Sequence, residues 1–118
     1  MDEKTTISEL KLKVKEFIDK RDWGKFHDVK ELSLALSVEA SELLEHFRWL
    51  KDEEITKKLN EKREDIEDEL ADITYFVLRI AEMNDIDLTK AIERKLNKNN
   101  DKYPINKVKG KNKKYDEY

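Results

Sequence analysis

Residues that interrupt secondary structure or cross-link a chain are almost absent from this sequence. It has two glycines and one proline among 118 residues, and no cysteine. Sheet architectures built from many tight turns need glycine and proline, and disulfide or thiolate-metal folds need cysteine, so both classes fit poorly. The length suits one domain and leaves no room for a second. We therefore predict an all-α fold.

Charge is distributed unevenly along the chain. The formal net charge of −3 combines a basic end with an acidic middle: residues 98–118 hold seven lysines against three acids, and residues 39–72 hold 13 acids against six bases. The basic end is too short for a nucleic-acid-binding domain. No apolar run reaches the roughly 18 residues that span a bilayer, and the charged N-terminus lacks the apolar core of a signal peptide. We predict a cytoplasmic protein with neither nucleic-acid nor membrane partners.

Apolar residues recur at helical spacing in four segments. The predicted helices cover residues 7–18, 29 to about 50, about 59 to 83, and 88 to a point before the Tyr103-Pro104 pair. The last helix must stop there because proline disfavours helix at the residue before it. The segments between helices are predicted to be a loop at residues 22–28 and a charged connector, with room for a helical turn, at residues 51–58.

Side chains suited to cap helices stand at three of the predicted starts. Threonines at positions 5 and 6 precede the first helix, Asp28 with Glu31 forms a capping-box-like start for the second, and Asp87 precedes the fourth. These signals favour a four-helix bundle over residues 1–104. The remaining residues, 105–118, are predicted to form a lysine-rich C-terminal tail.

Two pairs of acids interrupt the apolar stripes of the second and third helices. At 100° per residue, Glu39 falls about 20° from Leu32, inside the stripe, and Glu42 stands beside it at the stripe's edge. Glu69 and Asp72 repeat the spacing on the third helix, in a segment that becomes apolar nearly all round. We expect all four acids to face inward, with little solvent face left for Asp72.

A single inward acid is most simply explained by an ion pair or by a loosely packed edge of the bundle. Four acids on two helices that pack antiparallel favour a different explanation, because four close carboxylates cannot all stay ionised without a compensating cation. Neither helix shows an interior lysine or arginine beside them. We therefore predict a metal ion.

The available ligands indicate which metal. The residues three before the two histidines are Gly24 and Leu43, so the E-x-x-H pattern of dinuclear iron bundles is absent. An all-oxygen site suits Mg²⁺, with Mn²⁺ as a possible substitute, and Mg²⁺ usually completes its shell with water and substrate phosphates. The predicted chemistry is that of phosphate esters or anhydrides.

The motifs around these acids extend over most of the chain. The stretch from Val38 to Leu43, followed by Glu69-Leu70-Ala71-Asp72, resembles the E-x-x-E…E-x-x-D signature of MazG-like nucleotide pyrophosphohydrolases, which are all-α nucleoside triphosphate pyrophosphatases. The surrounding motifs resemble the dCTP pyrophosphatase branch in order and spacing, over about residues 8–104. They are Arg21-Asp22-Trp23, Phe26-His27, Leu34-Ala35-Leu36, Phe47-Arg48-Trp49, Asp87-Leu88, Lys95, Asn99 and Tyr103-Pro104.

The resemblance implies hydrolysis of a nucleoside triphosphate, foremost dCTP or a modified dCTP, to the monophosphate and pyrophosphate, in control or cleansing of the nucleotide pool. It implies that Glu39, Glu42, Glu69 and Asp72 hold Mg²⁺ and that the substrate is bound by Trp23, His27, Trp49, Phe76, Lys95 and Asn99. Where that branch usually has tyrosine this chain has Phe76, with Tyr75 one position earlier. This departure leaves the base preference open.

A mechanism follows from the residues themselves. A metal that bridges triphosphate oxygens would neutralise charge and orient the α-phosphorus for attack by water, which Glu39 or Glu42 would position or deprotonate. Each aromatic and basic residue also has a simpler explanation: Trp23 and Trp49 as core, His27 as a capping or surface histidine, and Lys95 as a solvated charge.

Two other functions remain open from the residues. One is a non-enzymatic helical interaction protein whose acids fix helix register through salt bridges. The other is a metal-dependent hydrolase of another phosphorylated small molecule, although two tryptophans favour a base. Because the third helix has more apolar surface than one chain can cover, we also predict a homo-oligomer. The resemblance implies dimers packed into tetramers.

Overall fold

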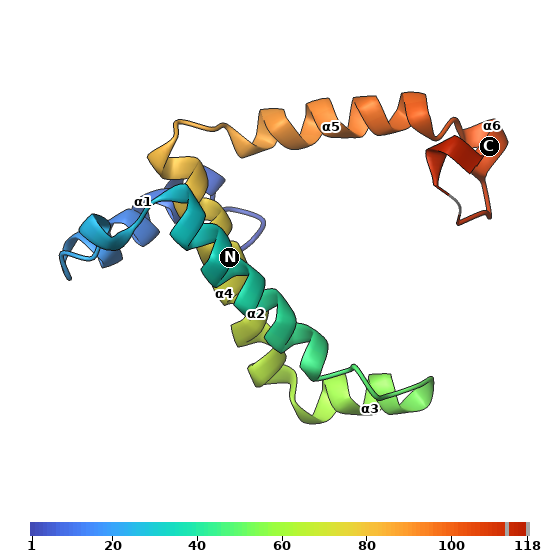
Figure 1. Ribbon diagram of the computed structural model, residues 1–118, viewed down its shortest axis with the longest axis horizontal. Coiled ribbons are helices and arrows are strands. Elements are labelled where there is room, and N and C mark those ends of the chain that lie inside the picture. The colour runs from blue at the N-terminus through green and yellow to red at the C-terminus, as the bar shows by residue number, and fades with distance from the viewer. Residues whose placement is uncertain (113, 118) are drawn as a thin grey trace. The chain divides into compact units, whose positions relative to one another are not determined.

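The computed structural model describes residues 1–112 and 114–117, and every regular element in that part of the chain is helical (Figure 1). The predicted all-α class is therefore confirmed. In chain order the elements are α1 Ile7–Asp19, η1 Gly24–Phe26, α2 Val29–Glu45, α3 Glu53–Glu61, α4 Arg63–Met83, α5 Leu88–Lys102, α6 Ile105–Val108 and η2 Tyr115–Glu117.

The chain divides into two compact units. The first comprises Met1–Asp85, with α1 to α4, and the second comprises Ile86–Tyr118, with α5, α6 and η2. The boundary that the sequence predicts between residues 104 and 105 lies inside the second unit, where helix α5 ends at Lys102.

Local capping explains where three helices begin. The hydroxyl of Thr6 accepts a hydrogen bond from the Glu9 amide at 3.1 Å, and the Asp28 carboxylate accepts one from the Glu31 amide at 2.7 Å. Asp87 likewise accepts the Lys90 amide at 2.9 Å. Each bond satisfies a backbone donor that has no partner within its helix. The three predicted starts are confirmed.

Two predicted boundaries and the predicted number of helices are wrong. Helix α2 ends at Glu45 rather than near residue 50, because the next amides bond three residues back, as Phe47 does to the Leu44 carbonyl at 2.9 Å. That bonding is tighter than an α-helix and turns the chain. The predicted connector begins the nine-residue helix α3. Lys62, with φ −117° and ψ 33°, then separates α3 from α4. The described residues thus contain six α-helices, not four.

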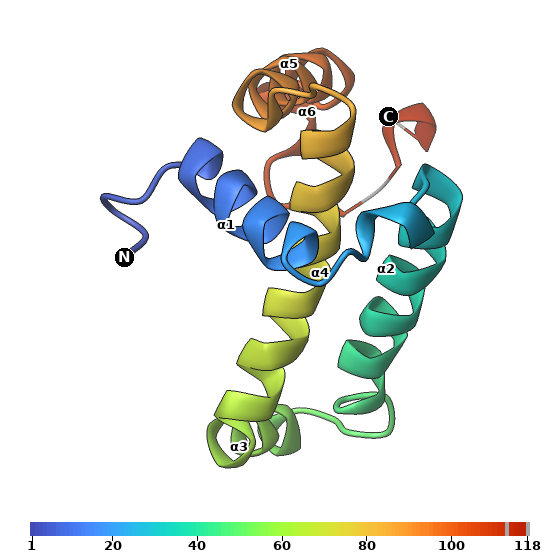
Figure 2. The same cartoon turned by 90° about the vertical axis from the view of Figure 1, so that its left-hand side faces the viewer.

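The first unit is built on helix α4. Figure 2 shows α2 and α4 side by side, with α1 packed against α4, and α3 connects the two long helices at one end. The fully or nearly fully buried apolar side chains come from α1, α2 and α4: Ile18, Leu32, Ile66, Leu78 and Ala81. Because His27 contacts Arg79 while Glu39 contacts Glu69, α2 and α4 run antiparallel, as the sequence predicts.

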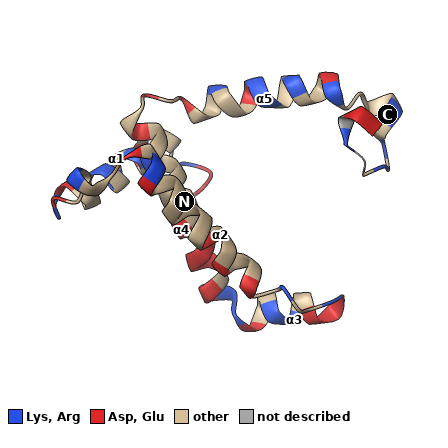
Figure 3. Cartoon of the chain, in the orientation of Figure 1, with Lys and Arg blue, Asp and Glu red and all other residues tan. Residues whose placement is uncertain are grey.

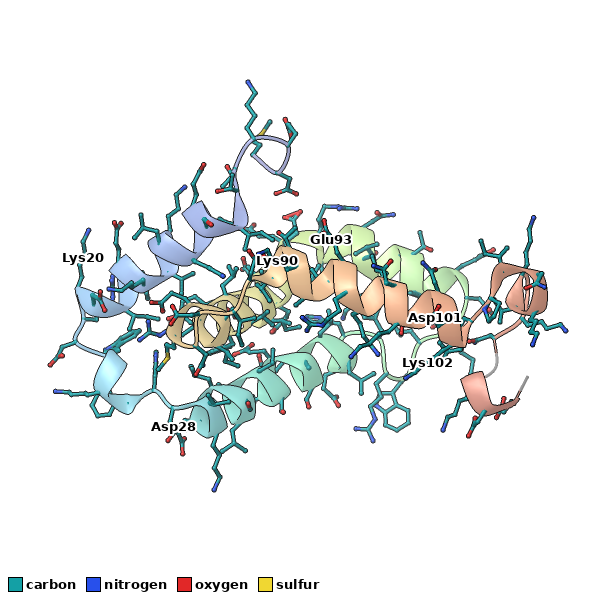
Figure 4. The ribbon with its side chains drawn as sticks, turned by 90° about the horizontal axis from the view of Figure 1, so that it is seen from above. Lys20, Asp28, Lys90, Glu93, Asp101 and Lys102 are labelled. Atoms are coloured by element: carbon teal, nitrogen blue, oxygen red, sulfur yellow. The ribbon has the colours of Figure 1, made fainter. Side chains whose placement is uncertain are left out.

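Charged side chains are arranged differently in the two units. In the first unit, acidic segments of α2 and α4 lie next to each other toward α3 (Figure 3). In the second unit, charged side chains project from α5, among them Lys90, Glu93, Asp101 and Lys102 (Figure 4). No helix in the described residues is long and apolar enough to cross a membrane.

Candidate active site

Three carboxylates meet between helices α2 and α4. One oxygen from each of Glu39, Glu69 and Asp72 lies within 4.8 Å of the others. Glu69 and Asp72 are one turn apart on α4, so their side chains stand on the same face of that helix, and the antiparallel packing sets Glu39 of α2 opposite them. The two helices thereby place three carboxyl groups in a single small volume.

The two glutamates of this cluster bury oxygens that lack partners. Oε2 of Glu39 and Oε2 of Glu69 are both buried, and neither has a hydrogen-bond partner among the described residues. When both groups are ionised, neither carboxylate has a proton to donate to the other. Protonating Glu39 supplies that proton. The hydrogen bond to Glu69, together with burial and the neighbouring Glu42 and Asp72 charges, raises the pKa of Glu39 to about 7.

The expectation that all four acids face inward is only partly met. Glu39 and Glu69 are half-buried, whereas Glu42 and Asp72 are exposed. Asp72 is exposed because its side chain forms part of the wall of a pocket. Glu42 lies at the edge of the α2 stripe, close enough to help raise the pKa of Glu39 but outside the three-oxygen cluster.

A pocket of about 610 Å³ adjoins the carboxylates, and Glu39 and Asp72 form part of its wall. The remaining wall comes from α1, the η1 loop and α4: Lys13, Val14, Phe17, Trp23, His27, Tyr75 and Phe76. The rings of Phe17 and Trp23 make an edge contact with centroids 5.8 Å apart, and Phe17 also meets Tyr75 at 6.2 Å. An aromatic wall next to an acidic cluster is suited to a ligand with one flat apolar end and one anionic end that a cation can neutralise.

Behind the pocket lies a buried charged residue, Arg79, which is only 5% exposed. Its Nε donates to Nδ1 of His27 at 3.2 Å, and its Nη1 donates to Oε2 of Glu82 at 2.5 Å. Helix α4 thus has an interior arginine, but this arginine pairs with none of the four acids, so the prediction that no interior lysine or arginine lies beside them is not contradicted. This arginine does not compensate the acidic cluster, since its guanidinium is hydrogen-bonded to His27 and Glu82.

The structure brings some of the predicted substrate-binding residues to this pocket. Trp23, His27 and Phe76 line it. Trp49 does not: it follows the end of α2, is 77% exposed and stacks against Arg48, whose guanidinium carbon is 4.5 Å from its ring centre. Lys95 and Asn99 lie on α5, in the second unit. The binding roles of all these residues stay predictions.

Several residues of the site are absent from the sequence-based prediction. Lys13, Val14 and Phe17 belong to an amphipathic first helix, where they resemble ordinary surface and core positions. Arg79 did carry a signal, because it is a charge within the otherwise apolar run Val77-Leu78-Arg79-Ile80-Ala81 and has an acid three residues later. Such a residue must find a buried partner.

The residues present fit a hard divalent cation. The cluster offers only carboxylate oxygens, and two of those oxygens are buried without a donor. Oxygen-only sets with several negative charges suit Mg²⁺ and Mn²⁺. The one buried cation in the described residues, Arg79, is held by His27 and Glu82, and Lys13, the lysine in the pocket wall, is exposed.

An antiparallel helix pair that carries E-x-x-E opposite E-x-x-D beside an aromatic pocket defines a class of all-α carboxylate-site proteins. The MazG-like family matches residues 34–118 of this chain. The chain therefore belongs to the MazG-like family, as the sequence motifs predict.

Known proteins resemble most of the chain. It is 34% identical to dCTP pyrophosphatase 1 of Bos taurus over 112 residues, which are 93% of this chain and 66% of the bovine protein. It is 32% identical to dCTP pyrophosphatase 1 of Homo sapiens over 114 residues, 95% of this chain and 67% of the human protein. The chain thus spans slightly less than two thirds of the length of the bovine relative.

A solved structure supports the fold. A pyrophosphatase from Archaeoglobus fulgidus is 36% identical in sequence and superposes with a TM-score of 0.79, covering 82% of this chain and 91% of that one. A fold likeness at this identity agrees with the family membership.

Proposed function

We propose that the chain is a nucleoside triphosphate pyrophosphohydrolase that converts dCTP, or a dCTP modified on its base, to the monophosphate and pyrophosphate. The observation that carries the proposal is the position of the Glu39, Glu69 and Asp72 cluster in and beside the wall of an aromatic pocket. Relatives named dCTP pyrophosphatase 1 support the substrate class.

The acidic cluster is the proposed metal site. Glu39, Glu69 and Asp72 would hold Mg²⁺, or Mn²⁺ in its place, and Glu42 completes the predicted set of ligands or neighbours. When bound, the cation supplies neutralisation of triphosphate charge and stabilisation of the departing pyrophosphate. Ionised Glu39 and Glu69 provide the opposing charge that holds it. Glu42, which lies outside the three-oxygen cluster, is left to position the attacking water and to take up its proton.

The aromatic wall is the proposed base subsite. Trp23, Phe17 and Phe76 offer ring faces and edges against which a nucleobase can pack. Tyr75 places a hydroxyl-bearing ring one position before Phe76, and burial raises its pKa, so it stays a neutral donor at physiological pH. His27 adds a polar group to the same wall. Shape and these few polar groups would then select the base.

Three of the predicted substrate-binding residues do not line the pocket. Lys95 and Asn99, on α5, are proposed to contact the nucleotide or its phosphates, and Trp49 its base.

We propose that the active form is a homo-oligomer, because α2 leaves large apolar side chains exposed, with Leu34 at 53%, Val38 at 55% and Leu44 at 58%. Light scattering of the full chain tests the oligomeric state.

The decisive experiment is a substrate panel. The full chain is incubated with Mg²⁺ and each natural nucleoside triphosphate, plus dCTP modified at the base, and the nucleotide product and the released phosphate species are both identified. The expected products are a monophosphate and pyrophosphate, with dCTP or a modified dCTP as the best substrate. Release of pyrophosphate from none of them, with Mg²⁺ or Mn²⁺, contradicts the proposal.

The substrate panel, combined with thermal-shift measurements with and without Mg²⁺, separates the proposal from its two rivals. A helical interaction protein would show no turnover and no metal-dependent thermal shift. A hydrolase of another phosphorylated small molecule would show a thermal shift with Mg²⁺ but no turnover of any nucleotide. Glu67, an exposed acid of α4 outside the cluster, offers a matched control, since Glu67→Gln changes the same kind of group without touching the site.

A further inference from the structure

His27 is held by a buried arginine on a different helix. Arg79 Nε donates to His27 Nδ1 across 52 positions of sequence, and the same guanidinium pairs with Glu82, whose side chain is 18% exposed. Arg79 is the one charged residue classed as buried in the part of the chain that the structure describes. A buried charge is destabilising unless it is paired and hydrogen-bonded. The partners of Arg79 are Glu82, on the same helix α4, and His27, in the loop before α2.

The direction of this hydrogen bond determines where the imidazole carries its proton. A guanidinium has only donors and stays charged, so Nδ1 of His27 must be the acceptor and can carry no hydrogen. The neutral ring then holds its proton on Nε2. A second proton on Nδ1 would face the guanidinium. Burial and the Arg79 charge accordingly lower the pKa of His27.

The loop that carries His27 is closely fitted to the same guanidinium. The His27 amide donates to the Gly24 carbonyl at 3.0 Å, which closes the η1 turn. A Cβ atom at Gly24 would stand 3.3 Å from Nη2 of Arg79, tighter than ordinary van der Waals contact. Gly24 thus lets the loop backbone approach the guanidinium, which also pairs with Glu82.

We propose that Arg79 is a positioning residue that holds His27 as the neutral Nε2–H tautomer, and that this N–H recognises an acceptor atom of the bound nucleobase. The proposal rests on the proposed function for the identity of the ligand. Nδ1 is turned to Arg79, so Nε2–H is the ring donor left for the pocket that His27 lines. An oxygen or an unprotonated ring nitrogen on the base edge is the partner that such a donor requires.

The first test reads the tautomer directly, without catalysis. The chain has two histidines, so long-range ¹H–¹⁵N spectra of this 118-residue chain contain signals from His27 and His46, and His46 serves as the internal reference. We expect His27 to show a protonated Nε2 and an unprotonated, hydrogen-bonded Nδ1. In Arg79→Lys, which keeps the charge but loses the planar fork, that signature should weaken while His46 is unchanged.

The second test reads the effect on substrate. Losing one base contact predicts a rise in KM for dCTP of about fivefold in Arg79→Lys, with a smaller change in kcat, since a neutral hydrogen bond is worth about 1 kcal/mol. His27→Gln, whose amide nitrogen lies near the Nε2 position, should restore much of the affinity lost in His27→Ala. In the His27→Ala background, Arg79→Lys should no longer raise KM, because Arg79 acts through His27.

A double variant guards against simple unfolding. Arg79→Met combined with Glu82→Met removes both charges together and leaves no unpaired charge in the interior. It should fold, lose the single tautomer of His27 and show the same rise in KM.

Each result decides a separate claim. An active wild-type chain in which the variants of Arg79 change neither the His27 tautomer nor KM overturns this inference and leaves the proposed function standing. A wild-type chain that turns over no nucleotide overturns the proposed function and the recognition of a base. The NMR spectra then decide the Arg79–His27 relationship alone, and an Nδ1–H tautomer in the wild type overturns it.

Discussion

Glu39 and Glu69 face each other across the α2–α4 interface, and each buries its Oε2 atom without a hydrogen-bond partner among the described residues. Because the two groups share one volume, one proton bound by Glu39 relieves both, which is why the pKa of Glu39 rises to about 7. Burial of two such oxygens costs free energy in the metal-free protein. The relationship therefore ties stability, pH and cation binding to the same pair of residues.

Stability of the metal-free chain should fall as pH rises between about 4.5 and 7. The folded state holds the Glu39 proton over this window while the unfolded state, with its ordinary pKa of 4.5, has lost it. The stabilising contribution is thus complete below the unfolded pKa and is lost as pH passes the folded one. Chemical denaturation of wild type and Glu39→Gln at several pH values, in chelator, measures the difference. A wild-type slope equal to that of Glu39→Gln contradicts the prediction.

Glu69→Gln should stabilise the metal-free chain and weaken cation binding. The amide supplies the donor that buried Oε2 of Glu39 lacks, whereas the loss of one negative charge removes a ligand oxygen for Mg²⁺. Turnover should fall by at least about a hundredfold, since the cation is expected to supply several kcal/mol of charge stabilisation. Thermal-shift measurements with and without Mg²⁺ test the predicted changes in stability and cation binding, and steady-state kinetics test the predicted loss of turnover.

The exposed acid Glu67 provides the comparison for that experiment. Glu67→Gln, on the same helix and outside the cluster, should leave the Mg²⁺ shift and turnover within about twofold of wild type. If Glu69→Gln behaves like Glu67→Gln, the three-carboxylate cluster is not the metal site.

The features of the fold that the sequence predicts correctly depend mostly on interactions between residues close in sequence. The caps at Thr6, Asp28 and Asp87 act within three residues, so the sequence alone locates them. The break at Lys62 has no such signal: most of the surrounding residues favour helix, and neither glycine nor proline is present to mark the separation of α3 from α4. Tertiary packing decides that boundary.

In the candidate site, too, the sequence predicts contacts within one helix but not contacts between residues far apart in the chain. The sequence predicts the acid pairs because the three-residue spacing within each pair is local to one helix. The bond between His27 and Arg79 joins positions 52 residues apart, so no periodicity reveals it. Trp49 shows the limit of position in a motif as a guide, since its ring lies against Arg48 and not in the pocket.

Nucleotide binding should quench the fluorescence of Trp23. Its ring lines the pocket, 5.8 Å from Phe17, whereas Trp49 is 77% exposed. Single-tryptophan variants, Trp49→Phe and Trp23→Phe, allow each ring to be followed alone during titration with dCTP and Mg²⁺. Trp23→Ala should also raise KM by on the order of tenfold or more, because base–aromatic stacking contributes roughly 1–3 kcal/mol.

Those titrations also test the predicted role of Trp49. Quenching confined to the chain that retains Trp23 is the expected result from the pocket geometry. Quenching in the variant that retains only Trp49 would instead support the nucleotide-binding role that the motifs predict for Trp49. Trp49 would then bind the nucleotide although it does not line the pocket. The absence of quenching at Trp23 contradicts the assignment of the base subsite.

Lys13 should contribute to binding of the triphosphate through its charge. It is the lysine in the pocket wall, on the opposite helix from Asp72, and it is exposed, so salt screens it. Lys13→Ala should raise KM about threefold to fivefold at low ionic strength, in keeping with the modest strength of exposed charge pairs, and by less in high salt. Lys20, at the end of α1 (Figure 4) and outside the pocket wall, is the matched control. Steady-state kinetics across a salt series measure the effect, and equal responses of Lys13→Ala and Lys20→Ala contradict a specific role for Lys13.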